Sequence, residues 1–79
     1  MSGSNTVPNV DGRKIAEARK AKTPRMSQEC VAKKLQLEGI DIDRGTVQWI
    51  EAGKRSVTRH ELDTIAAILN VMPEELLSD

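Results

Sequence analysis

The chain has 79 residues, which is enough for one modest core. It contains one Trp and no Tyr or Phe, and its formal net charge is zero. No segment approaches the roughly 18 apolar residues that span a bilayer, and the first residues lack the features of a signal peptide. The single Cys30 cannot form an internal disulfide, so we expect a reducing, cytoplasmic setting and no membrane partner.

Residues 1–10 are polar, contain Pro and lack periodicity, so we expect a disordered N-terminal arm, with the domain proper over residues 11–79. A first helix is predicted over about Asp11–Lys22, because Asp at its start is a good N-cap and a Thr-Pro pair follows its end. Its apolar face holds only Ile15 and Ala18, so this helix depends on the rest of the domain for its stability.

Two further helices are predicted, each opened by an N-cap side chain and ended by a glycine. The second helix starts at Ser27 and extends to Leu37 or Glu38, before Gly39. The third helix starts at Asp43 and extends to about Ala52, before Gly53. The short connection between them is half apolar, and we expect Ile40 or Ile42 to fill the core. In the third helix, the register points Val47 and Ile50 inwards.

Thr58 and Glu61 form a capping box, T-x-x-E, that opens a fourth helix. The apolar residues after it recur at i, i+3, i+4 and i+7, the clearest amphipathic pattern in the chain: Leu62, Ile65, Ala66 and Leu69. Asn70 can take the left-handed conformation that ends a helix, and Pro73 opens a last short helix. The sequence therefore predicts a compact all-α domain of five helices without strands.

The charges are segregated along the chain. All Lys and Arg lie between Arg13 and Arg59, and up to residue 60 the twelve basic and seven acidic residues leave a net charge of +5. Residues 61–79 carry five acids and no base. A basic body with an acidic end is a charge dipole that orients a protein on a polyanion, although a solvated surface with chance segregation is the alternative interpretation.

Two consecutive helices with a tight apolar connection and a basic loop after them are the arrangement of a helix-turn-helix, and the stretch from Met26 to Arg59 fits it. The first of these helices crosses the phosphate backbone, and the second lies in the major groove. In this register the outer face of the third helix carries four residues: Arg44, Gly45, Gln48 and Trp49. Arg can bond guanine, Gln can bond adenine, and an indole edge can pack on a thymine methyl group.

Trp49 has more than one interpretation. A lone Trp is usually part of a core, but the register of Val47 and Ile50 places this one outwards. Groove contact, a dimer contact and folding back over the second helix are all open at this point.

Residues 26–35 (MSQECVAKKL), 43–55 (DRGTVQWIEAGKR) and 61–71 (ELDTIAAILNV) resemble the phage repressor and Cro type of helix-turn-helix, the Xre-like family of bacterial transcriptional regulators. The resemblance covers residues 12–78, and it is specific because the three motifs follow one another in order. It implies a lambda-repressor-like fold that binds double-stranded DNA sequence-specifically, with a reading helix over about residues 43–52 in the major groove.

The resemblance also implies a role for individual residues. The base-reading positions are Arg44, Gly45, Gln48 and Trp49. The phosphate-binding positions are Gln28, Thr46, Lys54, Arg55 and Arg59, with a plain solvated loop as the alternative for Lys54 and Arg55. Arg19 and Glu51 match a structural salt bridge between the first helix and the reading helix. A two-fold symmetric operator and a homodimer are further implications, with the C-terminal apolar residues as the candidates for the dimer contact.

The sequence departs from the family pattern in the connection between Leu35 and Asp43, which is about four residues longer than usual, and between Arg19 and Ser27, which has about two extra residues. We expect the second helix to be extended by a turn. Gly45 has no side chain with which to read a base.

A protein-interaction module of the same fold, such as an antitoxin or a partner-bound regulator, is the alternative function, with the acidic tail and Trp49 as its contact surface. An enzyme is not expected, because the sequence shows no nucleophile–base pair, metal cluster or phosphate-binding Gly-rich loop. We likewise expect no metal and no cofactor.

Overall fold

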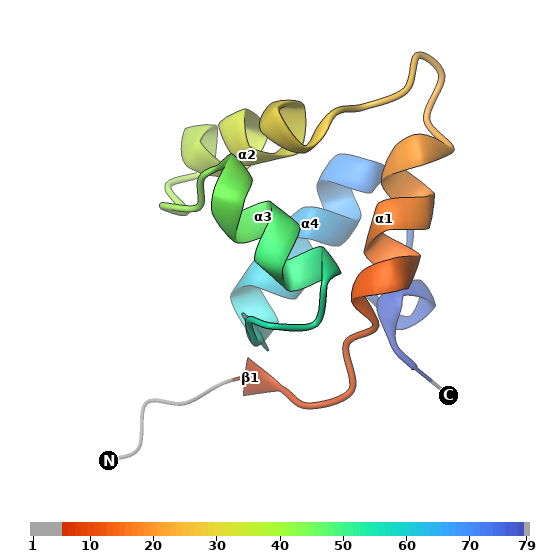
Figure 1. The fold of residues 1–79 in the computed structure, drawn as a ribbon, viewed down its shortest axis with the longest axis vertical. Coiled ribbons are helices and arrows are strands. Elements are labelled where there is room, and N and C mark those ends of the chain that lie inside the picture. Colours follow the sequence, from red (N-terminus) through yellow and green to blue (C-terminus); the bar gives the residue numbers. More distant parts are fainter. Residues whose placement is uncertain (1–5, 79) are drawn as a thin grey trace.

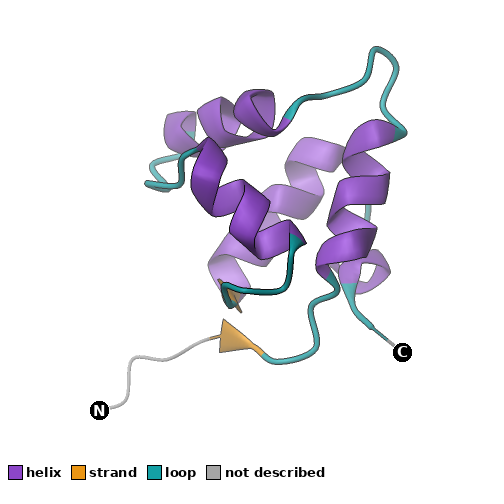
Figure 2. Ribbon diagram, viewed as in Figure 1, coloured by secondary structure: helices purple, strands orange, loops and turns teal. Residues whose placement is uncertain are grey.

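The computed structural model describes residues 6–78, which form four α-helices, one 3₁₀ turn and a sheet of two short strands. In chain order these are β1 (Thr6–Val7), α1 (Gly12–Lys20), α2 (Gln28–Leu37), α3 (Arg44–Glu51), β2 (Val57–Thr58), α4 (Arg59–Leu69) and the 3₁₀ turn η1 (Pro73–Leu76). Figure 1 shows α3 in front of α4, with α2 and α1 on either side, and Figure 2 shows how small the strands are beside the helices. No helix within residues 6–78 is long and apolar enough to cross a bilayer.

One apolar core lies between the helices. The predicted stripe of α4 is confirmed, because its four members are all buried: Leu62, Ile65, Ala66 and Leu69. The other core side chains come from the remaining helices, the α2–α3 connection, β2 and η1: Ile15, Val31, Ala32, Leu35, Ile40, Ile42, Val47, Ile50, Val57 and Leu76. Both Ile40 and Ile42 are therefore buried, which fixes the lengthened connection to the core.

The helix starts follow from local capping. The side chains of Asp11, Ser27, Asp43 and Thr58 each accept a hydrogen bond from a backbone N–H in the first turn of the helix that follows. The predicted N-caps are thus confirmed, and so is the capping box, since the Glu61 carboxylate accepts from the Thr58 N–H at 3.0 Å.

The helix ends depend on left-handed backbone. Gly39, with φ of 85°, follows the C-cap of α2, and Gly53, with φ of 76°, follows that of α3. Asn70 ends α4 in the same region, with φ of 61°. The α1 helix stops at Lys20, two residues earlier than predicted, and its last carbonyls accept from the N–H groups of residues 21 and 22.

The prediction of five helices without strands is wrong for the part of the chain that the structure describes. The last element, η1, is a 3₁₀ turn of four residues. β1 pairs antiparallel with β2, with Thr6 opposite Thr58 and Val7 opposite Val57. This pairing joins segments about fifty residues apart, which no local periodicity reveals.

The predicted disordered arm includes β1, and the structure differs from that expectation for residues 6–10. Besides the strand pairing, Val10 forms an isolated bridge with Leu77, and the Asn9 carbonyl accepts from the Ser78 N–H at 2.7 Å. These backbone bonds hold the segment on the domain surface. Residues 1–5 lie outside the described residues.

The start of α1 approaches the end of α3 more closely than any side chain would allow. Gly12 is buried, and a Cβ atom there would meet the carbonyl oxygens of Ile50 and Glu51, the latter at 2.5 Å. The absence of a side chain therefore lets α1 lie directly against the last turn of α3, the predicted reading helix.

Candidate nucleic-acid interface

The outer face of α3 is free of contacts with the core. Arg44, Gly45 and Gln48 are exposed, and Trp49 is 59% exposed, whereas Val47 and Ile50 on the inner face are 2% and 3% exposed. Trp49 is therefore not a core residue. The four predicted base-reading positions lie on one continuous exposed face of a single helix.

The N-terminus of α3 is held by Asp43. Its Oδ1 accepts from the Thr46 backbone N–H at 2.8 Å and from the Thr46 hydroxyl at 2.9 Å. These two hydrogen bonds hold the pKa of Asp43 below its ordinary value. The hydroxyl proton of Thr46 is thus already donated within the helix, which leaves only its oxygen lone pairs toward solvent.

A buried ion pair ties α1 to the last residue of α3. Arg19 Nε lies 2.7 Å from Glu51 Oε2, and the two side chains are 9% and 8% exposed. The second guanidinium nitrogen Nη2 donates to Glu51 Oε1 at 3.0 Å, so the pair is bidentate, and Nη1 donates to the Met26 carbonyl at 3.1 Å. Gln28 completes the arrangement, because its amide donates to Glu51 Oε1 at 2.9 Å.

This arrangement fixes the angle between the two helices of the motif. One carboxylate on α3 receives bonds from α1 and from the first residue of α2, so a rotation of α3 would break both. The resemblance pairs Arg19 with Glu51 and places Gln28 among the phosphate-binding positions. In the structure one N–H of the Gln28 amide is donated to Glu51, so this side chain braces α3.

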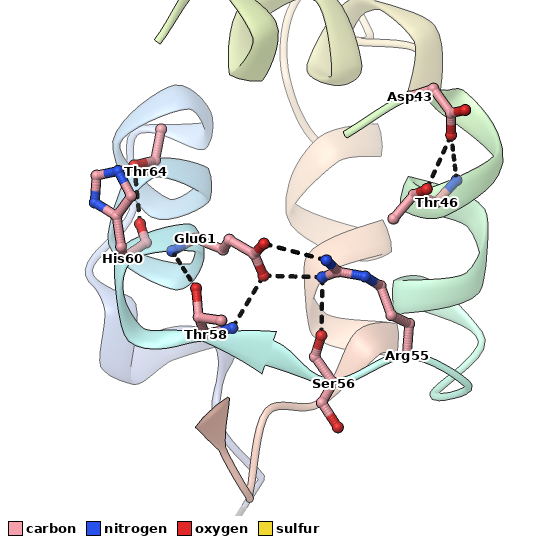
Figure 3. Close-up of polar contacts among 8 residues, drawn as sticks. All are labelled: Asp43, Thr46, Arg55, Ser56, Thr58, His60, Glu61 and Thr64. Atoms are coloured by element: carbon pink, nitrogen blue, oxygen red, sulfur yellow. Dashed lines mark hydrogen bonds and ion pairs between the residues drawn. The ribbon is translucent and has the colours of Figure 1, made fainter. Parts of the chain in front are cut away.

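The loop after α3 is anchored to the capping box of α4. Arg55 Nη1 and Nη2 donate to the two Glu61 carboxylate oxygens at 2.8 and 3.2 Å, and Nη1 also donates to the Ser56 carbonyl at 2.9 Å (Figure 3). Burial of the Glu61 carboxylate opposes ionisation, but the bonds from Arg55 and Thr58 outweigh it and lower the pKa of Glu61. The hydrogen bonds between Arg55 and Glu61 also raise the pKa of Arg55.

The predicted phosphate-binding cations therefore differ in how available their charges are to an external anion. Arg55 is only 35% exposed and is committed to Glu61, while Arg59 lies 3.5 Å from Asp63 in an exposed pair along α4. Lys54 is exposed and forms no ion pair with any described residue. Of the three, Lys54 has the charge most available to an external anion.

Two features of this region were not predicted. The Arg55–Glu61 pair is marked in sequence only by a basic residue six positions before the capping-box Glu. The contact of Gly12 with the end of α3 has no local signal, because it depends on the packing of two helices.

Comparison with known proteins gives two matches. The family model of the Cro/C1-type helix-turn-helix DNA-binding domain matches residues 13–79. The control protein C.MunI of a Mycoplasma species is 41% identical over 68 residues, which cover 86% of this chain and 84% of that protein. No solved structure matches the chain significantly.

Proposed function

The chain belongs to the family of Cro/C1-type helix-turn-helix DNA-binding domains and is a DNA-binding transcriptional regulator, and from this premise we propose that α3 enters the major groove of a specific operator. The observation that carries the proposal is the exposed outer face of α3, held at a fixed angle to α2 by the bonds to Glu51. A reading helix needs both properties, because its side chains must meet base edges in a reproducible orientation.

Three side chains on this face suit direct readout. Arg44 is in the first turn and can give a bidentate contact to guanine, and Gln48, one turn later, can do the same for adenine. Trp49 presents a largely exposed indole that can pack against a thymine methyl group. Because Gly45 has no side chain, the helix can approach the bases closely at this position. A Cβ atom there would meet no backbone within 4 Å, so packing within the protein does not require this glycine.

The phosphate contacts position the helix. Lys54 supplies the free charge of the loop, and Arg59 joins it when its exposed pair with Asp63 opens, since such pairs contribute little. Arg55 shapes the loop through Glu61 and presents the remaining edge of its guanidinium. Gln28 can donate the second N–H of its amide to a phosphate, whereas Thr46 can do so only when its hydroxyl turns away from Asp43.

A regulator of this kind would act as a homodimer on a two-fold symmetric operator, with one α3 in each half-site. The relative with 86% coverage of this chain is called a control protein, which supports regulation as the role in place of a protein-interaction module. For the dimer contact we propose the exposed Met72 and the half-buried Leu77 near the C-terminus, since Leu76 is buried.

The test is selection of bound sequences from random duplex DNA, followed by binding measurements between low and physiological salt. We expect a single site with two-fold symmetry and an affinity that falls steeply with salt. Arg44→Ala and Trp49→Ala should relax the sequence preference while the domain stays folded, and Lys54→Ala should weaken all sequences alike. An almost flat salt response and no selected sequence, alongside a tight complex with a protein, would favour the interaction module.

A further inference from the structure

The segment that leads into α1 lies alongside the loop after α3 over the whole length of that loop. At one end β1 pairs with β2, with Val7 opposite Val57, and at the other end Gly12 packs against carbonyl oxygens in the last turn of α3. Between these ends, residues of both segments border a common hollow of about 200 Å³. Figure 1 shows β1 beside the loop that leads from α3 to α4.

This loop carries Lys54, the cation that the proposed function gives to a phosphate. Its start is held by α3, since the Lys54 N–H donates to the Trp49 carbonyl at 2.8 Å. Its far end is held at β2, because Arg55 and the capping box tie it to α4, and β1 holds it through the strand pair. Val57 of β2 is 2% exposed, so this end of the loop is also part of the core.

The segment that contains β1 is itself anchored to the domain. The Asp11 N–H donates to the Leu76 carbonyl at 2.8 Å, and the Asn9 carbonyl accepts from the Ser78 N–H at 2.7 Å. The side chain of Val7 is half-buried and packs against the core. A strand pair of this length is marginal alone, but these anchors present β1 to β2 at a high effective concentration.

We infer that Val7 is a positioning residue for DNA binding, which holds β1 on β2 and thereby keeps the loop in the form in which Lys54 meets a phosphate. The inference rests on the proposed function and adds to it a residue outside the helix-turn-helix. A loop that is already ordered loses less conformational entropy on binding, so the affinity depends on the strand pair. Residues 1–10 carry no charged side chain, so Val7 acts through Lys54 and not as a charge of its own.

The experiment is a double-mutant cycle between Val7→Gly and Lys54→Ala, with binding to the selected operator measured between low and physiological salt. Glycine removes the side chain that packs against the core, disfavours a strand and changes no charge. Val7→Gly should weaken binding about fivefold per subunit for every DNA sequence and make the slope of log K against log salt shallower by up to about 0.9 per subunit. In the Lys54→Ala background the same substitution should have no further effect.

The matched control is Ala18→Gly. Ala18 is also a partly buried apolar residue packed against the core, but it lies in α1 and does not border the hollow beside the loop. Glycine there lowers the stability of the domain through helix propensity, so the salt slope should stay unchanged and any loss of affinity should be equal in both backgrounds.

Two further variants keep the test decisive. Val7→Ile retains a β-branched side chain and should bind as the wild type does. Val7→Ala takes the place of Val7→Gly in the cycle if the glycine variant does not fold. All variants are compared at a temperature at which thermal denaturation shows each of them to be folded.

The results separate the two proposals. If the wild type selects an operator but Val7→Gly matches Ala18→Gly in affinity and salt slope, the inference is wrong and the proposed function stands. If Val7→Gly weakens binding equally with and without Lys54, β1 acts by another route and the inference is again wrong. If Lys54→Ala does not weaken binding, the inference falls together with the Lys54 contact, and if the wild type selects no sequence, both proposals fall.

Discussion

Arg19 and Glu51 form a bidentate ion pair in which both side chains are at least nine-tenths buried, and at this pair α1, α2 and α3 meet through polar atoms. The guanidinium also bonds the Met26 carbonyl, and the carboxylate also accepts from Gln28. Each charge is therefore surrounded by partners, which is the condition under which a buried pair is tolerated. Its role is to define the orientation of the reading helix.

Removing one partner of this pair should be strongly destabilising. Arg19→Ala leaves the Glu51 carboxylate buried without its counter-ion, and we expect the free energy of unfolding to fall by about 3 kcal/mol or more, as measured by denaturant titration. The double variant Arg19→Met, Glu51→Leu should lose clearly less, since no unpaired charge is left. A single variant as stable as the wild type would contradict the assignment.

Gly12 and Gly45 should respond in opposite directions to the same substitution. Gly12→Ala forces a Cβ into the carbonyls of Ile50 and Glu51, and we expect a loss of about 1–3 kcal/mol despite the better helix propensity of Ala. Gly45→Ala meets no backbone and should gain up to about 1 kcal/mol. Thermal denaturation of the two variants tests this, and equal shifts in their melting temperatures would show that close packing at Gly12 is not decisive.

Gly45→Ala should also separate stability from DNA binding. If the missing side chain lets α3 approach the bases, the variant folds more stably but binds the operator about tenfold more weakly, an ordinary penalty for one steric mismatch at a groove contact. Binding is measured on the selected operator, with the melting temperature recorded for the same sample. An unchanged affinity would mean that the glycine is only tolerated there.

Stability should decline in acid because of Glu61. Its pKa is lowered in the folded state, so the folded protein binds fewer protons than the unfolded chain, and stability increases with pH. This contribution is complete above the ordinary value of 4.5 and is lost as the pH falls through the lower folded-state pKa.

The comparison that checks it is urea unfolding of wild type, Glu61→Gln and Arg55→Gln between neutral and acidic pH. Both variants should be less stable than wild type at neutral pH, and their free energy of unfolding should fall less on acidification. Arg55→Gln should also raise the pKa of Glu61 in a carboxyl NMR titration. Parallel acid profiles for wild type and Glu61→Gln would disprove the linkage.

The elements that were predicted correctly are those specified by residues close in sequence. Each N-cap, the capping box and the left-handed Asn70 depend on a few neighbouring residues, so reading the sequence is enough to find them. The direction of Trp49 followed from the register of Val47 and Ile50, because one helical period relates all three.

The features that were missed depend on contacts between distant segments. The β1–β2 pairing and the approach of Gly12 to Ile50 exist only once the helices have packed, and neither leaves a periodic pattern. The partner of Arg55 was missed for a related reason. The phosphate-binding interpretation and the ion pair with Glu61 require the same residue type, and only the geometry separates them.

The exposure of Trp49 gives this molecule an intrinsic optical reporter of one surface. The chain has no Tyr and no second Trp, so its indole fluorescence comes entirely from Trp49 on the outer face of α3. Its emission should already resemble that of a hydrated indole in the native state and change little on unfolding. Quenching by stacked or adjacent bases would then report occupation of the reading face itself, free of any background from the core.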